Sequence, residues 1–229
     1  MNEEISRLQQ QAEQGDAAAQ FELALAYCNG QGVPQNYGKA CELYQQAADR
    51  GYVAAQVNLG FMYADGMGVP QSYGKAVEWL QKAAEQGDAV GQYNLADMHL
   101  NGLGVPQSDA EAVKWYTKAA EQGDPDAQYN LGYLHGKERA GAKGWAAFGK
   151  AVEWIRKAAG QGHSNAIKWL QLAAGQDTSN ALTADTQYEL GDMYFKGEGV
   201  PQNHDEAAKW WRKAAAQGQR QAIEALRLL

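Results

Sequence analysis

Ser72 and Lys75 are the first residues whose types and spacing could do chemistry, because they fit the pattern S-x-x-K. In enzymes with this pattern the serine is a nucleophile. The S-D-N and K-T-G strings that accompany the pattern in such enzymes are missing, and Ser72 holds the position that Asn36 and Ser108 hold elsewhere. Since Ser and Asn are common helix N-caps, we interpret Ser72 as a cap. A ligand-binding or hydrolytic enzyme using Ser72 is a remote alternative, and we expect no catalytic residue.

Two cysteines and two histidines are further candidates. Cys28 and Cys41 are too few for a disulfide framework and lack the spacing of a zinc site, so we expect free thiols. His99 and His135 lie 36 residues apart. In a helical repeat of that length they would start roughly 10 Å apart, the distance between packed helices. No cluster of cysteines or carboxylates completes a ligand set. We therefore expect no metal and no cofactor.

Composition excludes several classes of protein. The chain has 229 residues, with 20 Lys+Arg and 27 Asp+Glu, and a formal net charge of −7. The basic residues are scattered, so phosphate backbones and anionic lipids would be repelled, and we expect no nucleic acid as partner. No stretch reaches the roughly 20 apolar residues of a spanning helix, so we expect no membrane insertion. Because no secretory signal is present, we expect a cytoplasmic protein, or a periplasmic or secreted one if a leader was trimmed.

Two short strings recur along the chain. One begins with a glutamine and has a leucine three residues later; its glutamines are Gln20, Gln56, Gln92, Gln128 and Gln187. The first three steps are 36 residues each. The other string begins with a large apolar residue, namely Leu43, Trp79, Trp115, Trp154 or Trp210. A unit of 36 residues that holds two such strings predicts stacked helical hairpins, with these tryptophans packed between units.

Helix signals agree with this period. Apolar residues recur at helical spacing in both halves of a unit. Between the halves a Gly-Val-Pro-Gln segment recurs, in which glycine permits positive φ and proline stops the helix. Aspartates after glycine mark helix starts, where a carboxylate accepts hydrogen bonds from first-turn amides; these are Asp16, Asp88 and Asp124.

The recurring residues closely resemble a known family. The pattern A-Q-x-x-L-G-x-x-Y, then G-x-G-V, then K-A-x-x-W-x-x-K-A-A-x-Q-G is similar to the Sel-one-like repeat (SLR) family, a branch of the tetratricopeptide-like helical repeats. The resemblance covers nearly the whole chain. It implies an all-α fold, a right-handed α-solenoid (superhelix) of stacked two-helix hairpins.

We expect one solenoid domain over residues 1–229, with one irregular region. The step from Gln128 to Gln187 is 59 residues, because the fourth unit has three extra residues and a truncated unit follows it. Capping helices are expected over residues 1–15 and 219–229. The units between them are expected at 16–51, 52–87, 88–123, 124–162, the truncated 163–185, and 186–218.

The resemblance also implies a binding surface, because the first helix of each unit lines the concave face in tetratricopeptide arrays. The inward positions form an aromatic strip rimmed by carboxylates, namely Phe61, Tyr93, Asp97, Tyr129, Tyr133, Tyr188 and Asp192. Such a surface suits a partner protein or peptide with apolar or aromatic side chains among Lys or Arg. The alternative is that some tyrosines only pack against the next unit.

The irregular loop of the fourth unit is a second candidate contact site. It combines basic residues with an aromatic one, namely Lys137, Arg139, Lys143 and Trp145. Exposed aromatic residues on loops are often functional.

The function that the resemblance implies is a non-enzymatic protein–protein interaction scaffold or adaptor, which binds its partner on the concave aromatic and acidic face. The strict repeats are typical of bacterial proteins. The alternative is an immunity or inhibitor protein that neutralises a secreted bacterial toxin enzyme, because SLR proteins of that class occur. In that case the loop from Lys137 to Trp145 would be a candidate plug.

Overall fold

The computed structural model describes residues 3–137, 144–175 and 181–227, with the backbone alone for 144–147 and 181–182. These residues form thirteen helices and no strand, which confirms the all-α fold of helical hairpins. The chain divides into two compact units, Met1–Ala119 and Ala120–Leu229, and each is described by itself. The description of the whole chain as one solenoid domain stays a prediction.

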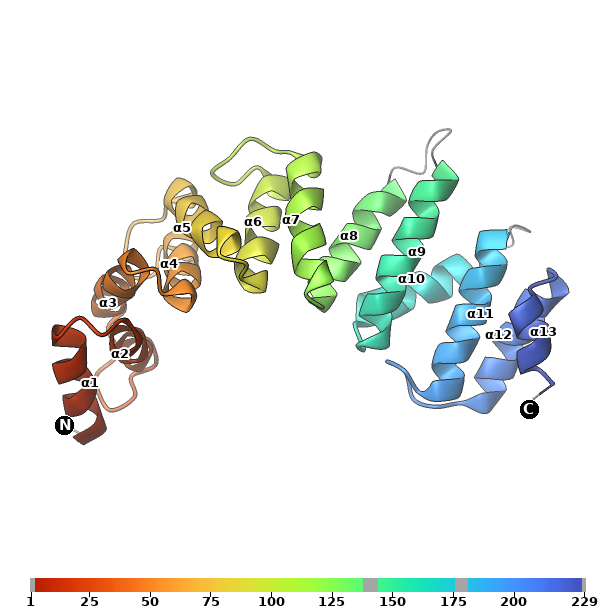
Figure 1. The fold of residues 1–229 in the computed structure, drawn as a ribbon, viewed down its shortest axis with the longest axis horizontal. Helices are drawn as coiled ribbons and strands as arrows, with labels where there is room; N and C mark the ends of the chain where they lie inside the picture. Colours follow the sequence, from red (N-terminus) through yellow and green to blue (C-terminus); the bar gives the residue numbers. More distant parts are fainter. Residues whose placement is uncertain (1–2, 138–143, 176–180, 228–229) are drawn as a thin grey trace. The chain divides into compact units, whose positions relative to one another are not determined.

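The first unit is a stack of antiparallel helices in which each helix packs on its neighbours in sequence (Figure 1). The first helix packs on the second. The helices are α1 (Glu3–Glu13), α2 (Ala17–Asn29), α3 (Tyr37–Asp49), α4 (Val53–Asp65), α5 (Tyr73–Glu85), α6 (Ala89–Asn101) and α7 (Asp109–Glu121), of which α7 ends just beyond the boundary of the unit.

The second unit contains two hairpins with one single helix between them. Its helices are α8 (Pro125–Lys137), α9 (Gly144–Gly160), α10 (Ser164–Gly175), α11 (Ala181–Lys196), α12 (His204–Ala216) and α13 (Arg220–Ala225). The hairpins are α8–α9 and α11–α12, and α10 packs against both α9 and α11. The truncated unit predicted at 163–185 therefore contains the whole of α10 and the start of α11.

The predicted caps begin the first helices of the hairpins. The Asp16 carboxylate accepts hydrogen bonds from the amides of Ala18 and Ala19 at 2.9 and 3.1 Å. Asp88 and Asp124 do the same for the amides three residues later, both at 2.7 Å. Each such cap stabilises a helix by about 1 kcal/mol.

The loop inside the regular hairpins needs its glycine for two reasons. Gly68 has φ +73, which side chains rarely adopt, and a Cβ built on it would lie 2.4 Å from the Tyr37 carbonyl group of the preceding hairpin. Gly104 has φ +74, and its Cβ would lie 2.5 Å from the Tyr73 carbonyl group. The glycine thus allows the loop of one hairpin to touch the helix start of the previous one.

The tryptophans of the second helices are core residues, as the repeat predicts. Trp79, Trp115 and Trp210 are only 7%, 4% and 8% exposed, and Trp154 is half-buried. In each case the ammonium of the lysine three residues later lies over the ring, 3.7 to 4.4 Å from its centroid. A cation over an aromatic face stabilises both groups, so ring and lysine form one packing element.

The recurring glutamines are buried and join successive hairpins. The Nε2 atoms of these glutamines donate to alanine carbonyls of the preceding helix at 2.8 to 3.2 Å; the pairs are Gln20–Ala12, Gln56–Ala48, Gln92–Ala84, Gln128–Ala120 and Gln187–Ala174. The Oε1 atom of Gln56 accepts from Gln86 at 2.8 Å, and that of Gln187 accepts from Gln217 at 2.8 Å. We call each buried glutamine with its partners a glutamine clamp. Buried amides need such partners.

Candidate functional site

Ser72 is placed as a helix cap rather than as a nucleophile. Its Oγ accepts a hydrogen bond from the Lys75 amide at 3.4 Å, at the start of α5. The Lys75 ammonium lies 5.0 Å from the centroid of the Tyr63 ring. The lysine side chain therefore packs on an aromatic ring, and the capping interpretation accounts for both residues.

The two cysteines are free thiols, as predicted. Burial raises the pKa of the Cys28 thiol and also that of the Cys41 thiol. Burial likewise raises the pKa of the neighbouring Tyr44, whose hydroxyl accepts a hydrogen bond from Asn58 Nδ2 at 3.1 Å. Because the thiolate is the reactive form, raised pKa values make these thiols poor nucleophiles at neutral pH.

In the first unit the predicted contact residues are largely engaged inside their own hairpins. Phe61 on α4 is half-buried. Tyr93 on α6 is half-buried, with its ring 5.7 Å from the Tyr116 ring on α7. The carboxylate of Asp97 accepts a hydrogen bond from the hydroxyl of the buried Tyr116. Tyr93 and Asp97 are thus brought together through Tyr116.

In the second unit two of the predicted tyrosines lie side by side on α8. The rings of Tyr129 and Tyr133 are stacked with centroids 6.4 Å apart. The other face of this group is closed by His163, whose ring is stacked on Tyr129 at 4.7 Å. His163 Nδ1 accepts from the Ala166 amide at 3.1 Å, and its Nε2 lies 3.0 Å from the Asp126 carboxylate. His163 therefore caps α10 and holds it to α8.

Tyr188 and Asp192 lie on α11, in a separate part of the second unit. Asp192 pairs with Lys196 at 2.5 Å, which raises the pKa of that lysine. Burial and the neighbouring Asp192 carboxylate raise the pKa of Tyr188. Both residues line a hollow of about 340 Å³ together with Trp211 and Glu224. Of the two predicted carboxylates, Asp97 is thus hydrogen-bonded and Asp192 is ion-paired.

Beside Tyr133 lies a pocket that the repeat pattern did not predict. Its volume is about 320 Å³, and it is bounded by α8, α9 and α10. Its main lining residues are Tyr133, Lys137, Phe148, Trp169 and Leu172, and we call it the Tyr133 pocket. The Phe148 and Trp169 rings lie 5.7 Å apart, and the Lys137 ammonium lies 5.3 Å from the centroid of the Tyr133 ring.

The Tyr133 pocket is exposed and apolar. Leu172 is 72% exposed and Tyr133 is 46% exposed, whereas Phe148 is buried. Of its residues Tyr133 and Lys137 were predicted from the sequence, whereas Phe148, Trp169 and Leu172 were not. The available signal was the segment after the fourth unit, which departs from the 36-residue period.

The loop of the fourth unit lies mostly outside the described residues. Arg139 and Lys143 are among the residues not described, and of Trp145 only the backbone is described, in α9. The second predicted contact site is therefore represented by Lys137 alone. Its role stays a prediction.

Metal sites and membrane-spanning helices are two further classes of feature that the described part of the chain could contain. There, no three His, Cys, Asp or Glu side chains gather so that they could hold a metal ion. In the same residues no helix is both long and apolar enough to cross a membrane. The chemistry that the described surface offers is apolar and aromatic contact beside single charges.

Comparisons with known proteins agree with the helical hairpins. The sequence model of one family, described as the Sel1 repeat, matches residues 17–52, 53–88, 89–124, 125–163, 164–177 and 184–219. No curated protein matches the chain.

Two solved bacterial structures are similar over nearly the whole chain. A Sel1 repeat protein from Oxalobacter formigenes is 33% identical with a TM-score of 0.67, over 96% of this chain and 68% of that one. A protective antigen of uropathogenic Escherichia coli strains, which displays an SLR fold, is 31% identical with a TM-score of 0.67. That match covers 97% of this chain but only 58% of the antigen, so the chain spans little more than half of the antigen's length.

Proposed function

The chain belongs to the Sel1 repeat family, and on that premise we propose that it binds a partner protein through the Tyr133 pocket. Sel1 repeat proteins are generally protein-interaction scaffolds without enzymatic activity. The observation that carries the finer proposal is the exposure of Leu172 and Tyr133 beside the buried Phe148 ring and the half-buried Trp169 ring.

The exposed residues of the pocket have the character of an interface. Contiguous apolar surface is uncommon on proteins without a partner, and here Leu172 is 72% exposed beside the half-buried Trp169. Interface hot spots are enriched in aromatic residues that line well-packed pockets. A partner side chain that enters the pocket would cover Leu172 and contact the Phe148 and Trp169 rings.

The charge at the edge of the Tyr133 pocket indicates which charged residues of the partner lie next to the side chain that enters the pocket. Lys137 is exposed over Tyr133, at the edge of the pocket. The carboxylates that suggested a basic partner, Asp97 and Asp192, are already engaged with Tyr116 and Lys196. We therefore propose that the partner presents an apolar or aromatic side chain next to Asp or Glu, because opposite charges steer association and fix its register.

The experiment compares capture of partners by three proteins. The three bait proteins are the wild type, the Leu172→Lys variant and the Val90→Lys variant. Each is first shown by circular dichroism to be helical. Val90 is the matched control, since it is a 47% exposed apolar residue on α6 in the other unit. We expect the partner to be retained by the wild type and by Val90→Lys, and lost by Leu172→Lys. Equal retention by Leu172→Lys would contradict the proposal.

The same experiment separates a scaffold from an inhibitor. A captured enzyme whose activity falls as the complex forms would indicate the immunity class, which stays a prediction. A captured protein whose activity is unchanged would support the scaffold. In both cases the loss of capture by Leu172→Lys locates the contact at the Tyr133 pocket.

A further inference from the structure

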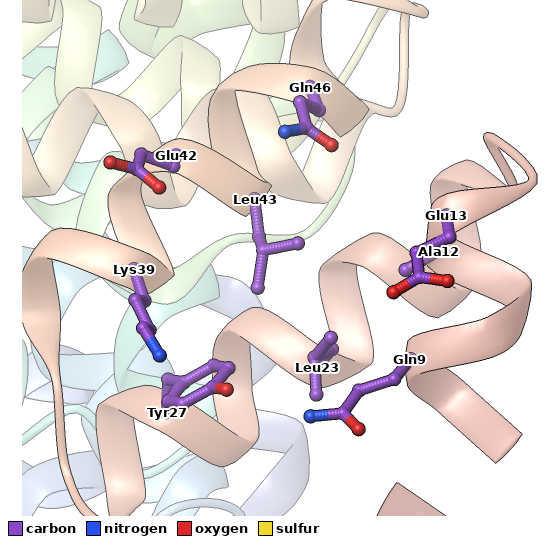
Figure 2. A pocket seen from close by; sticks show the side chains of 9 residues that line it. All are labelled: Gln9, Ala12, Glu13, Leu23, Tyr27, Lys39, Glu42, Leu43 and Gln46. Atoms are coloured by element: carbon purple, nitrogen blue, oxygen red, sulfur yellow. The ribbon is translucent and has the colours of Figure 1, made fainter. Parts of the chain in front are cut away.

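A second cleft lies at the other end of the chain, in the first unit. It has a volume of about 400 Å³ and is bounded by α1, α2 and α3. Figure 2 shows Leu43 of α3 directed into the space between the helices, with Gln9 and Glu13 on the α1 side and Leu23 on α2. The volume is within the range of pockets that hold small ligands or single side chains.

The repeat explains why this cleft is empty of side chains. Leu43 holds the position that Trp79, Trp115, Trp154 and Trp210 hold in other hairpins. In the second hairpin Trp79 packs into the core cluster of α3 and α4 and is only 7% exposed. Leu43 packs at the same place against α1 and α2. A smaller side chain at an aromatic position leaves volume unfilled, so the cleft includes the place that an indole occupies in the other hairpins.

The cation that accompanies each indole is also missing. Lys82 lies 3.7 Å from the centroid of the Trp79 ring, three residues after it. The residue three after Leu43 is Gln46, which lines the cleft and carries no charge. The first hairpin therefore lacks both members of the pair that fills this position in the second.

The charges around the cleft are mainly negative. Glu13 of α1 and Glu42 of α3 both line it and are exposed, and among the described residues neither forms an ion pair. Lys39 also lines the cleft, with its ammonium 5.3 Å from the centroid of the Tyr27 ring, so the lining carries two carboxylates and one ammonium. A cation brought by a ligand would be attracted by carboxylates on two helices.

We propose that this cleft binds an aromatic side chain of a partner protein, an indole best of all, with a Lys or Arg next to it. The partner would supply the ring and the cation that the other hairpins carry themselves. An aromatic side chain buries 150–250 Å², and here it would cover Leu23 and Leu43. This site differs in place and in charge from the Tyr133 pocket and does not depend on it.

The test is a titration with short peptides, followed by NMR of the backbone amides. The probe is N-acetyl-Trp-Lys-amide, and the control peptides are N-acetyl-Trp-Glu-amide and N-acetyl-Ala-Lys-amide. We expect saturable shifts confined to the helices around Leu43. We expect affinity at least about fivefold weaker for the Glu peptide and about tenfold weaker for the Ala peptide.

Two reciprocal variants test whether the absence of an indole at Leu43 creates the binding site. Leu43→Trp should fill the cleft, abolish the shifts and raise the midpoint of thermal unfolding. Trp79→Leu should open the equivalent cleft in the second hairpin and add a second set of saturable shifts near α4 and α5. Leu172→Lys, which alters only the Tyr133 pocket, should bind the probe as the wild type does.

Other results would overturn the proposal. These are equal binding by wild type and Leu43→Trp, equal affinity for the Trp and Ala peptides, or no saturable shift up to about 10 mM peptide. If Leu43→Trp does not fold, the double variant Glu13→Lys/Glu42→Lys replaces it, because both side chains are exposed. Binding of the Trp-Lys peptide that is unchanged by this double variant would also overturn the proposal.

Discussion

The hairpins α6–α7 and α8–α9 place different residues at the same two repeat positions. In α6–α7 these are Asp97 and Tyr116, which are hydrogen-bonded to each other. In α8–α9 they are Tyr133 and Ile155. Ile155 is fully buried and has no hydroxyl to offer, and Tyr133 is 46% exposed beside an apolar pocket. The inward side chains of α6–α7 thus pair with each other, whereas Tyr133 of the irregular hairpin stays largely exposed.

The largest loss of stability is expected from a substitution in the loop of a regular hairpin. Gly68→Ala should lower the free energy of unfolding by about 2–4 kcal/mol, because it combines strain at positive φ with a clash against the Tyr37 backbone. Gly51→Ala is the control, since its φ is +84 but nothing lies within 4 Å of an added Cβ. We expect Gly51→Ala to lower the free energy of unfolding by about 1 kcal/mol. Urea unfolding followed by circular dichroism measures both, and equal costs would exclude a role for the loop contact.

A smaller difference should separate the tryptophans of regular and irregular hairpins. Trp79→Leu should cost about 2 kcal/mol, because Trp79 is 7% exposed and its removal leaves a cavity. Trp154→Leu should cost about 1 kcal/mol, since Trp154 is half-buried. Both carry a lysine over the ring, at 3.7 and 4.0 Å, so the cation contact is matched. The same denaturant curves report the result, and a reversed order would show that the irregular hairpin is the better packed.

The glutamine clamp should matter equally in both regions. Gln56→Leu should cost about 1–2 kcal/mol, because it leaves the Ala48 carbonyl and the Gln86 amide without their partner. Gln187→Leu should cost a similar amount, since Gln187 makes the same two bonds. Amide hydrogen exchange of the adjoining helices provides the measurement. If Gln187→Leu leaves the amide exchange rates unchanged, the clamp beside the irregular segment does not contribute to stability.

The smallest effects on stability are expected for the two exposed side chains Leu172 and Val90. Of these, Leu172 is the one whose substitution should abolish binding. Leu172→Lys and Val90→Lys alter side chains that are 72% and 47% exposed. Each should shift the free energy of unfolding by less than about 0.5 kcal/mol. Thermal unfolding checks this before the capture experiment. A large loss of stability for Leu172→Lys alone would show that Leu172 is a packing residue instead.

Much of the fold could be predicted from the sequence, because the sequence signals of each helix and loop recur in several repeat units. The caps at Asp16 and Asp88, the loops, and the burial of Trp79 follow from residue type and position alone. The glutamines gave the correct period, yet their role was not predicted. A buried amide needs partners on two other helices, and single-chain periodicity does not show which helices are near.

The candidate site could be predicted only in part, because it depends on pairs of residues. The pattern placed Asp97 and Tyr133 at equivalent positions, but their environments are set by Tyr116 and Ile155 on the facing helices. The Tyr133 pocket needs Trp169 from a helix outside the regular period. The cleft at Leu43 was not predicted: the sequence shows a leucine where the other repeats have tryptophan, but the volume follows from the packing of three helices.

The glutamine clamp also bears on how the number of repeats can change. In the regular hairpins the clamp joins residues 8 apart in sequence, as in Gln56 and Ala48, and after the single helix it joins Gln187 to Ala174, 13 apart, at the same bond length or shorter. The joint between hairpins is therefore fixed by the two bonding groups and not by the length of chain between them. A recombination event that removes or duplicates 36 residues between two such glutamines would recreate an intact joint. The packing of the joint is thus compatible with the gain or loss of whole hairpins.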